Sequence, residues 1–121
     1  RGGNGGLGTS SSISGVSVLY AEGGAGGGIV GGTTAGSGGD GGYSGSAYGR
    51  NAVANSGSGG GGQYATAATY AGNGGSGIVV IRYANTYAAL ASIGAGLPYS
   101  YADTGGYHVY SFTAGTGDIT P

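Results

Sequence analysis

Three short stretches of the chain carry the side-chain pattern that is typical of β-strands. Residues 16–20 (VSVLY) place apolar side chains at every second position, so that these would share one face. Residues 78–83 (IVVIRY) are apolar on both faces for four positions, as in a buried strand. Residues 107–113 (YHVYSFT) are aromatic and β-branched, and Gly105 and Gly106 before them suit a turn. The pattern predicts a small all-β fold.

Runs of glycine separate short islands of other residues in the first two thirds of the chain. Of the 35 glycines, 29 fall within residues 1–77. The islands, residues 9–14, 50–56 and 63–71, hold mostly small side chains and tyrosine. Glycine does not recur at every third position and the chain has only 2 prolines, which excludes collagen. A flexible linker would not need 11 tyrosines and apolar strands.

Extended polyglycine II is the conformation that suits the long glycine runs. It has three residues per turn and no hydrogen bonds within one helix, so its N–H groups can bond to parallel neighbours. Only glycine lets the backbones come close enough. We therefore expect an all-β fold with extended glycine-rich, polyglycine II-like segments and short strands joined by Gly-rich loops, in an oligomeric fibre or filament.

The expected domain organisation follows from where glycine becomes scarce. Residues 1–83 would form one glycine-rich β/polyglycine unit ending in the strand 78–83, and residues 84–104 a linker. Residues 105–121 would be the first strand of a following unit, or a strand exchanged with a neighbouring copy. Pairing of this strand with 78–83 of its own chain is the alternative. In the favoured case the inter-subunit strand is formed by Tyr107, Val109, Tyr110 and Phe112.

Composition excludes several classes of function. The chain has no Cys, and therefore no disulfide and no thiolate metal site. Its three arginines are spread over the sequence and it has no lysine, so we expect no nucleic-acid partner. No apolar run approaches the roughly 20 residues of a spanning helix, so we expect no membrane insertion. The chain has no Met, and Arg1 is read as the start of a fragment of a longer protein.

Motifs that suggest chemistry are weak in this sequence. The spacing of a dinucleotide-binding loop at residues 26–31 arises from composition alone, and Asp40 lacks the nine-residue repeat of a calcium-binding array. His108 is the single histidine, and nothing in the sequence builds a nucleophile elbow or an oxyanion hole near it. We expect no catalytic, cofactor-binding or metal-binding residues, no cofactor, and no enzymatic activity.

The tyrosines in and beside the islands are the candidate recognition residues. Aromatic side chains in such positions either pack against other parts of the fold or present stiff amphipathic contacts to a partner. Both alternatives stay open. The candidates for receptor or partner contact are Tyr43, Tyr48, Tyr64 and Tyr70.

Three stretches together resemble the glycine-rich domain of phage tail-fibre and other virion appendage proteins. They are residues 8–24, residues 74–83 (GGSGIVVIRY) and residues 105–117 (GGYHVYSFTAGTG). The order departs from the usual one of the family, because the stretch that resembles the opening strand comes last here. The resemblance implies virion appendage structure and host attachment, and it carries no catalytic residues over.

The function that we expect is a structural and adhesive component of a phage tail fibre or similar virion appendage. Its partners would be further copies of itself, as a homo-oligomer, and a host cell-surface glycan or protein, and its location the virion or the extracellular space. The alternative is the subunit of a bacterial extracellular filament assembled by strand exchange. An ice- or surface-binding polyglycine protein is disfavoured, because the glycine runs lack a regular tripeptide repeat.

Overall fold

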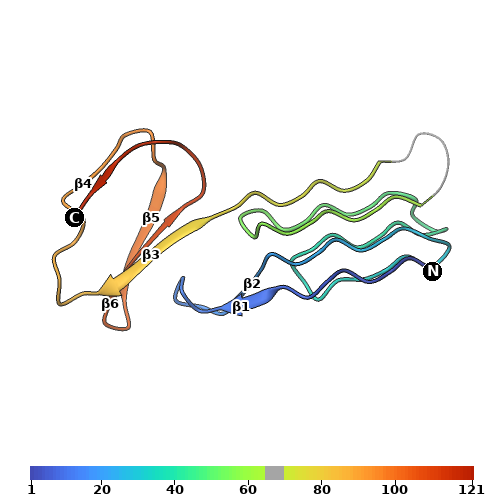
Figure 1. Cartoon of the computed structure of the whole chain (residues 1–121), viewed down its shortest axis with the longest axis horizontal. Coiled ribbons are helices and arrows are strands. Elements are labelled where there is room, and N and C mark those ends of the chain that lie inside the picture. Colours follow the sequence, from blue (N-terminus) through green and yellow to red (C-terminus); the bar gives the residue numbers. More distant parts are fainter. Residues whose placement is uncertain (65–69) are drawn as a thin grey trace. The chain divides into compact units, whose positions relative to one another are not determined.

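The computed structural model describes residues 1–64 and 70–121, and within these ranges the fold is all-β without a helix. The chain forms two compact units (Figure 1). The first consists of Arg1–Ser10 and Leu19–Gly77, and the second of Ser11–Val18 and Ile78–Pro121. The described residues include no helix that is long and apolar enough to cross a membrane.

The strands are short and pair only in small sheets. A hairpin joins β1 to β2, a three-stranded antiparallel sheet has the order β3-β6-β5, and β4 pairs with β7. The predicted strands 78–83 and 107–113 are confirmed as β3 and β6, and the predicted strand 16–20 is shortened to β2. The bounds are β1 Thr9–Ser11, β2 Val18–Tyr20, β3 Val79–Ala84, β4 Ser92–Ile93, β5 Tyr99–Thr104, β6 Tyr107–Phe112 and β7 Ile119–Thr120.

The glycine runs of the first unit lie outside these sheets as seven segments that run back and forth side by side (Figure 1). Consecutive segments run in opposite directions. For example, the N–H groups of Gly23 and Gly26 donate to the carbonyls of Gly6 and Gly3, which is an antiparallel pairing with a step of three residues. The segments are I (residues 1–8), II (22–28), III (30–34), IV (37–43), V (47–53), VI (57–64) and VII (70–77).

Segments II, IV and VI run parallel and form the centre of this bundle. Their backbone bonds follow one another around the three segments, and each full round moves the contact by three residues. The bonds run from the N–H of Gly28 to the carbonyl of Gly42, from Gly42 to Gly62, from Gly62 to Ala25, from Ala25 to Gly39, from Gly39 to Gly59 and from Gly59 to Glu22, with lengths of 2.7–3.1 Å. The centre is thus held by a continuous spiral of main-chain hydrogen bonds.

The remaining four segments surround this centre and complete two layers. On one side of the centre, backbone bonds join segment I to II and III, and segment III to II and IV. On the other side, they join segment V to IV, VI and VII, and segment VII to V and VI. These neighbours place III, IV and V in one layer and I, II, VI and VII in the other. Segment IV, in the middle of its layer, lies over the pair II and VI.

Glycine is required in the interior because the backbones approach too closely for a side chain. A Cβ atom on Gly24 would lie 1.9 Å from the carbonyl oxygen of Gly60, and one on Gly61 would lie 1.9 Å from that of Asp40. Neither residue has a positive φ. Glycine is therefore required at these positions by the close approach of the backbones and not by the backbone conformation. In contrast, Gly3 and Gly6 at the surface have no atom near such a Cβ.

The second unit is built on the sheet β3-β6-β5, with β6 in the middle. One face carries aromatic rings from all three strands, among them Tyr83 of β3, Tyr101 of β5, and His108 and Tyr110 of β6. The ring centroids of Tyr101 and Tyr110 lie 4.8 Å apart, and those of Tyr83 and His108 lie 5.1 Å apart. Such tilted and edge-to-face pairs stabilise a sheet beyond the area that they bury.

The opposite face of the sheet packs against residues 11–18. Val109 is buried there, the guanidinium of Arg82 lies 4.0 Å from the ring centroid of Tyr107, and Arg82 Nη1 donates to the carbonyl of Ser12 at 3.0 Å. Residues 11–18 and 78–83 therefore belong to the second unit. The expected unit 1–83 included both of these ranges, whereas the structure assigns neither of them to the first unit.

The expected linker 84–104 also differs from the structure, because it contains β4 and β5. Gly105 and Gly106 have φ values of 57° and 82°, which suit a two-residue hairpin turn, and this turn folds β5 back onto β6. The other edge of β6 pairs with β3 of the same chain. The structure thus shows the alternative, in which residues 107–112 pair with β3 of their own chain. Both edges of β6, which carries Tyr107, Val109, Tyr110 and Phe112, are occupied within its own unit.

Candidate functional site

One end of the glycine bundle, the turn end, holds the connections between segments II and III and between segments IV and V (Figure 1). The turn between IV and V is closed by two bonds, from the N–H of Tyr43 to the carbonyl of Ser46 and in the reverse direction. Segment VI ends and segment VII begins beside it, because Tyr64 donates to Ala47 and Gly49 donates to Tyr70. The fold thus brings the four candidate tyrosines of the sequence to one end.

The turn end is rich in exposed aromatic and apolar side chains. Tyr43 is 49 % exposed, Tyr48 56 % and Tyr70 72 %, whereas Tyr64 is half-buried. The rings of Tyr48 and Tyr70 stack at a centroid distance of 6.3 Å with an angle of 14° between their planes. Residues 65–69 of the predicted island 63–71 lie outside the described residues.

Ile29 and Val30 extend this apolar surface, and the sequence reasoning did not select them. Both side chains are exposed, at 68 % and 57 %; Ile29 connects segments II and III, and Val30 begins segment III. Their signal in the sequence was an isolated apolar pair within a glycine run. Exposed apolar groups that gather in this way are typical of contact surfaces.

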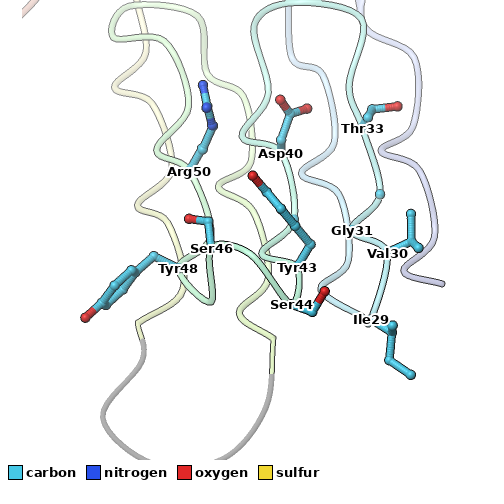
Figure 2. A pocket seen from close by; sticks show the side chains of 12 residues that line it. Ile29, Val30, Gly31, Thr33, Asp40, Tyr43, Ser44, Ser46, Tyr48 and Arg50 are labelled. Carbon is cyan, nitrogen blue, oxygen red and sulfur yellow. The ribbon is translucent and has the colours of Figure 1, made fainter.

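A shallow hollow of about 440 Å³ opens on the layer of segments III, IV and V next to the turn end (Figure 2). Arg50 of segment V, Asp40 of segment IV and Thr33 of segment III lie at one level across it (Figure 2). The side chain of Tyr43 lies along segment IV with its hydroxyl toward Asp40 (Figure 2). The hollow combines an acid and an aromatic ring of segment IV with the guanidinium of segment V.

The carboxylate of Asp40 is held in place by the neighbouring segment. Its Oδ1 accepts a hydrogen bond from the backbone N–H of Thr34 at 2.9 Å and another from the Thr34 hydroxyl at 3.2 Å. The main chain of Asp40 is fixed as well, because its carbonyl accepts from the N–H of Arg50 at 2.9 Å. The acid and the guanidinium are therefore carried by directly bonded backbones.

At the opposite end of the bundle a second carboxylate, that of Glu22, is 1 % exposed and serves the fold itself. It accepts hydrogen bonds from the backbone N–H groups of Gly38, Ala35, Ser37 and Gly36, and from the Ser37 hydroxyl. The bond from Gly38 contributes most to lowering the pKa of Glu22 to about 2, against the opposing effect of burial. Glu22 is thus held ionised and closes the turn between segments III and IV.

The histidine lies in the aromatic face of the second unit and uses both ring nitrogens. Nδ1 lies 2.9 Å from the hydroxyl of Tyr101, and Nε2 lies 3.1 Å from the carbonyl oxygen of Tyr87. Since a carbonyl only accepts, Nε2 carries a hydrogen and donates to Tyr87, while Nδ1 pairs with the Tyr101 hydroxyl.

The strand residues expected at an interface between subunits are instead placed within the second unit. Val109 and Tyr110 are 3 % exposed, Phe112 is 8 % exposed, and Tyr107 lies against Arg82. Within residues 1–64 and 70–121, no group of three or more His, Asp or Glu side chains is placed to hold a metal ion. The turn end and the adjoining hollow therefore remain the candidate site.

Comparison of the chain with protein-family models, with curated proteins and with solved structures finds no match.

Proposed function

We propose that the protein is a structural and adhesive component of a phage tail fibre or similar virion appendage, located in the virion or outside the cell. In this proposal the first unit is a polyglycine II scaffold, and its turn end makes the contact with a host cell-surface glycan or protein. The observation that carries the proposal is the gathering of exposed tyrosines with Ile29 and Val30 at one end of a hydrogen-bonded glycine bundle.

The bonding pattern supports polyglycine II for the scaffold. Bonds between segments recur every third residue, as expected for helices with three residues per turn. Carbonyl oxygens of a neighbouring segment occupy the space that side chains would need, as at Gly24 and Gly61. A bundle held by main-chain bonds in this way is stiff and loses little conformational freedom when its end binds a partner.

The composition of the turn end supports a role in recognition. Tyrosine provides a large contact area with only two side-chain torsions, and serine adds adaptable hydrogen bonding; binding loops combine the two for this reason. Ser44 and Ser46 stand beside Tyr43 and Tyr48 in the turn between segments IV and V. The glycine segments themselves offer few side chains that would identify a partner.

Assembly with further copies, as a homo-oligomer, is part of the proposal, because a virion fibre has several subunits. The filament alternative required β6 to leave its own chain. Since β3 and β5 occupy both edges of β6, no observation favours strand exchange. We therefore keep the adhesive appendage as the proposed function.

The test measures attachment of the fluorescently labelled protein to a panel of bacterial strains. We expect Tyr48→Ala and Tyr70→Ala each to weaken binding to a susceptible strain about tenfold, because each removes one ring of the stacked pair. Tyr87→Ala, an equally exposed tyrosine in the second unit, is the matched control and should bind normally.

Size-exclusion chromatography with light scattering is run on the same variants. If Tyr48→Ala and Tyr70→Ala bind normally, or if they lose assembly instead of attachment, these tyrosines serve packing and the proposed contact surface is wrong.

A further inference from the structure

We infer that the hollow on segments III, IV and V binds a neutral saccharide, with Asp40 and Arg50 as its polar contacts and Tyr43 as its aromatic wall. The inference rests on the proposed adhesive function, and it names the ligand class that this part of the turn end takes.

The hollow has the size and stiffness of a small-molecule site. Its volume of about 440 Å³ lies in the range of about 300–1,000 Å³ that is common for ligand pockets. The floor is main chain that is hydrogen-bonded on both sides. The backbone N–H of Arg50 donates to the carbonyl of Asp40 at 2.9 Å, and the N–H of Gly61 donates to the carbonyl of Arg50 at 2.9 Å. Polar groups fixed on such a floor need little ordering when a ligand arrives.

The charges of the hollow select hydroxyl groups over ions. Asp40 uses Oδ1 for Thr34, and Oδ2 accepts no hydrogen bond from the described residues, so it is available as an acceptor. The Arg50 guanidinium supplies donors only. A sugar hydroxyl both donates and accepts, so neighbouring hydroxyls satisfy the two groups together. An anionic ligand would meet the Asp40 carboxylate, and a cationic ligand would meet Arg50.

The apolar part of the hollow suits the C–H face of a sugar ring. Tyr43 lies three residues after Asp40 on segment IV and shares its face, and its ring is 49 % exposed. The side chains of Ile29 and Val30 border the hollow beside segment III (Figure 2). One aromatic wall next to a few fixed polar groups is the usual composition of a small-molecule site.

The experiment records amide correlation spectra of the full 121-residue chain during titration with methyl glycosides of glucose, galactose, mannose and N-acetylglucosamine. N-acetylneuraminic acid and glucosamine serve as the anionic and cationic probes. We expect at least one neutral glycoside to shift the amide signals of Thr33, Gly41 and Ser46, with no shift in the second unit. The two charged probes should leave these signals in place.

Two variants and two matched controls test the named contacts. Asp40→Asn keeps an oxygen for Thr34 while it replaces Oδ2 by a donor, and Arg50→Gln removes the guanidinium while the backbone bonds stay. Each should weaken binding of the active glycoside about tenfold, as expected for the loss of a hydrogen bond to a charged group. Asp118→Asn and Arg1→Gln change the same charges outside the hollow and should bind as the unaltered chain does.

The inference is overturned if no neutral glycoside shifts the three signals, if the anionic probe binds in preference, or if Asp40→Asn and Arg50→Gln bind normally. In each of these cases the dependence of cell attachment on Tyr48 and Tyr70 would still stand, so the proposed function would survive. Conversely, glycoside binding in a protein that attaches to no strain would retain the saccharide site and reject the adhesive function.

Discussion

Glu22 shows how much of this fold depends on single polar side chains among glycines. Its carboxylate accepts from four consecutive backbone N–H groups, Ala35 to Gly38, at the turn between segments III and IV. The backbone N–H of Glu22 donates to the hydroxyl of Ser58 at 3.0 Å. The sequence did not indicate this role, because the donors are main-chain groups that leave no pattern in side chains.

The pH dependence of stability follows from the pKa of Glu22. Folding lowers this pKa from 4.5 to about 2, so the folded state favours the ionised form. The contribution to stability is therefore fully present above pH 4.5 and is lost as the pH falls from 4.5 toward 2. We expect Glu22→Gln to lower the melting temperature at pH 7 and to flatten the melting temperature between pH 5 and pH 2.

Thermal melts followed by the glycine amide signals measure this effect. Asp118→Asn, an exposed acid of the second unit, is the control and should keep the slope of the unaltered chain. If the melting temperature of Glu22→Gln falls between pH 5 and pH 2 as steeply as that of the unaltered chain, another group controls the loss of stability in acid.

At the scale of elements, strands and glycine segments differ in how far the sequence predicts them. Residues 78–83 were recognised as a run that is apolar on both faces, and residues 107–113 by their aromatic and β-branched side chains. The strand β5, Tyr99–Thr104, was missed: all six residues are exposed, and its order depends on pairing with β6. Which glycine segments pair with one another could not be predicted from the sequence, because a residue without a side chain does not specify which backbone it will contact.

Hydrogen exchange tests the three-residue period of the segments. In segment II the N–H groups of Gly23, Ala25, Gly26 and Gly28 donate to backbone carbonyls, whereas Gly24 and Gly27 donate to none within the described part of the chain. We expect exchange at least tenfold faster at Gly24 and Gly27 than at their neighbours.

The same period should appear in segment VI, with Gly59, Gly61 and Gly62 protected and Gly60 exchanging faster. Amide exchange followed by nuclear magnetic resonance resolves each position. Uniformly fast exchange along both segments would mean that the runs are loops, and the polyglycine II interpretation would fail.

At the scale of the whole molecule, two units are stabilised by different means. The first depends on main-chain hydrogen bonds between glycine segments, and the second on aromatic packing across β3, β6 and β5. Glycine becomes scarce after residue 77, where the first unit ends, although the expected unit ran to residue 83. The sequence could not show that residues 11–18 cross to the second unit, because that crossing depends on contacts such as Arg82 with Ser12, which are 70 residues apart.

Separate stabilisation predicts separate unfolding. Phe112→Ala removes a ring that is 8 % exposed in the second unit, and we expect this to cost about 3 kcal/mol of that unit's stability. The amide signals of His108 and Val109 should then disappear at a lower temperature, while those of Gly42 and Gly62 are lost at the original one.

Val16→Ala is the control, since Val16 is 67 % exposed. If Phe112→Ala lowers both transitions equally, the two units unfold as one and the division of stabilising forces is wrong.

The spiral of bonds around segments II, IV and VI has a mechanical consequence. The turn end lies at one end of the segments, and Gly77, where the chain leaves the first unit, lies at the other. A pull between these two points acts along the segments, whereas the hydrogen bonds lie across them. The force therefore loads many hydrogen bonds in shear at the same time. These bonds must rupture together, because the geometry does not let them open one after another. A tether built this way resists tension without a disulfide and without a hydrophobic core.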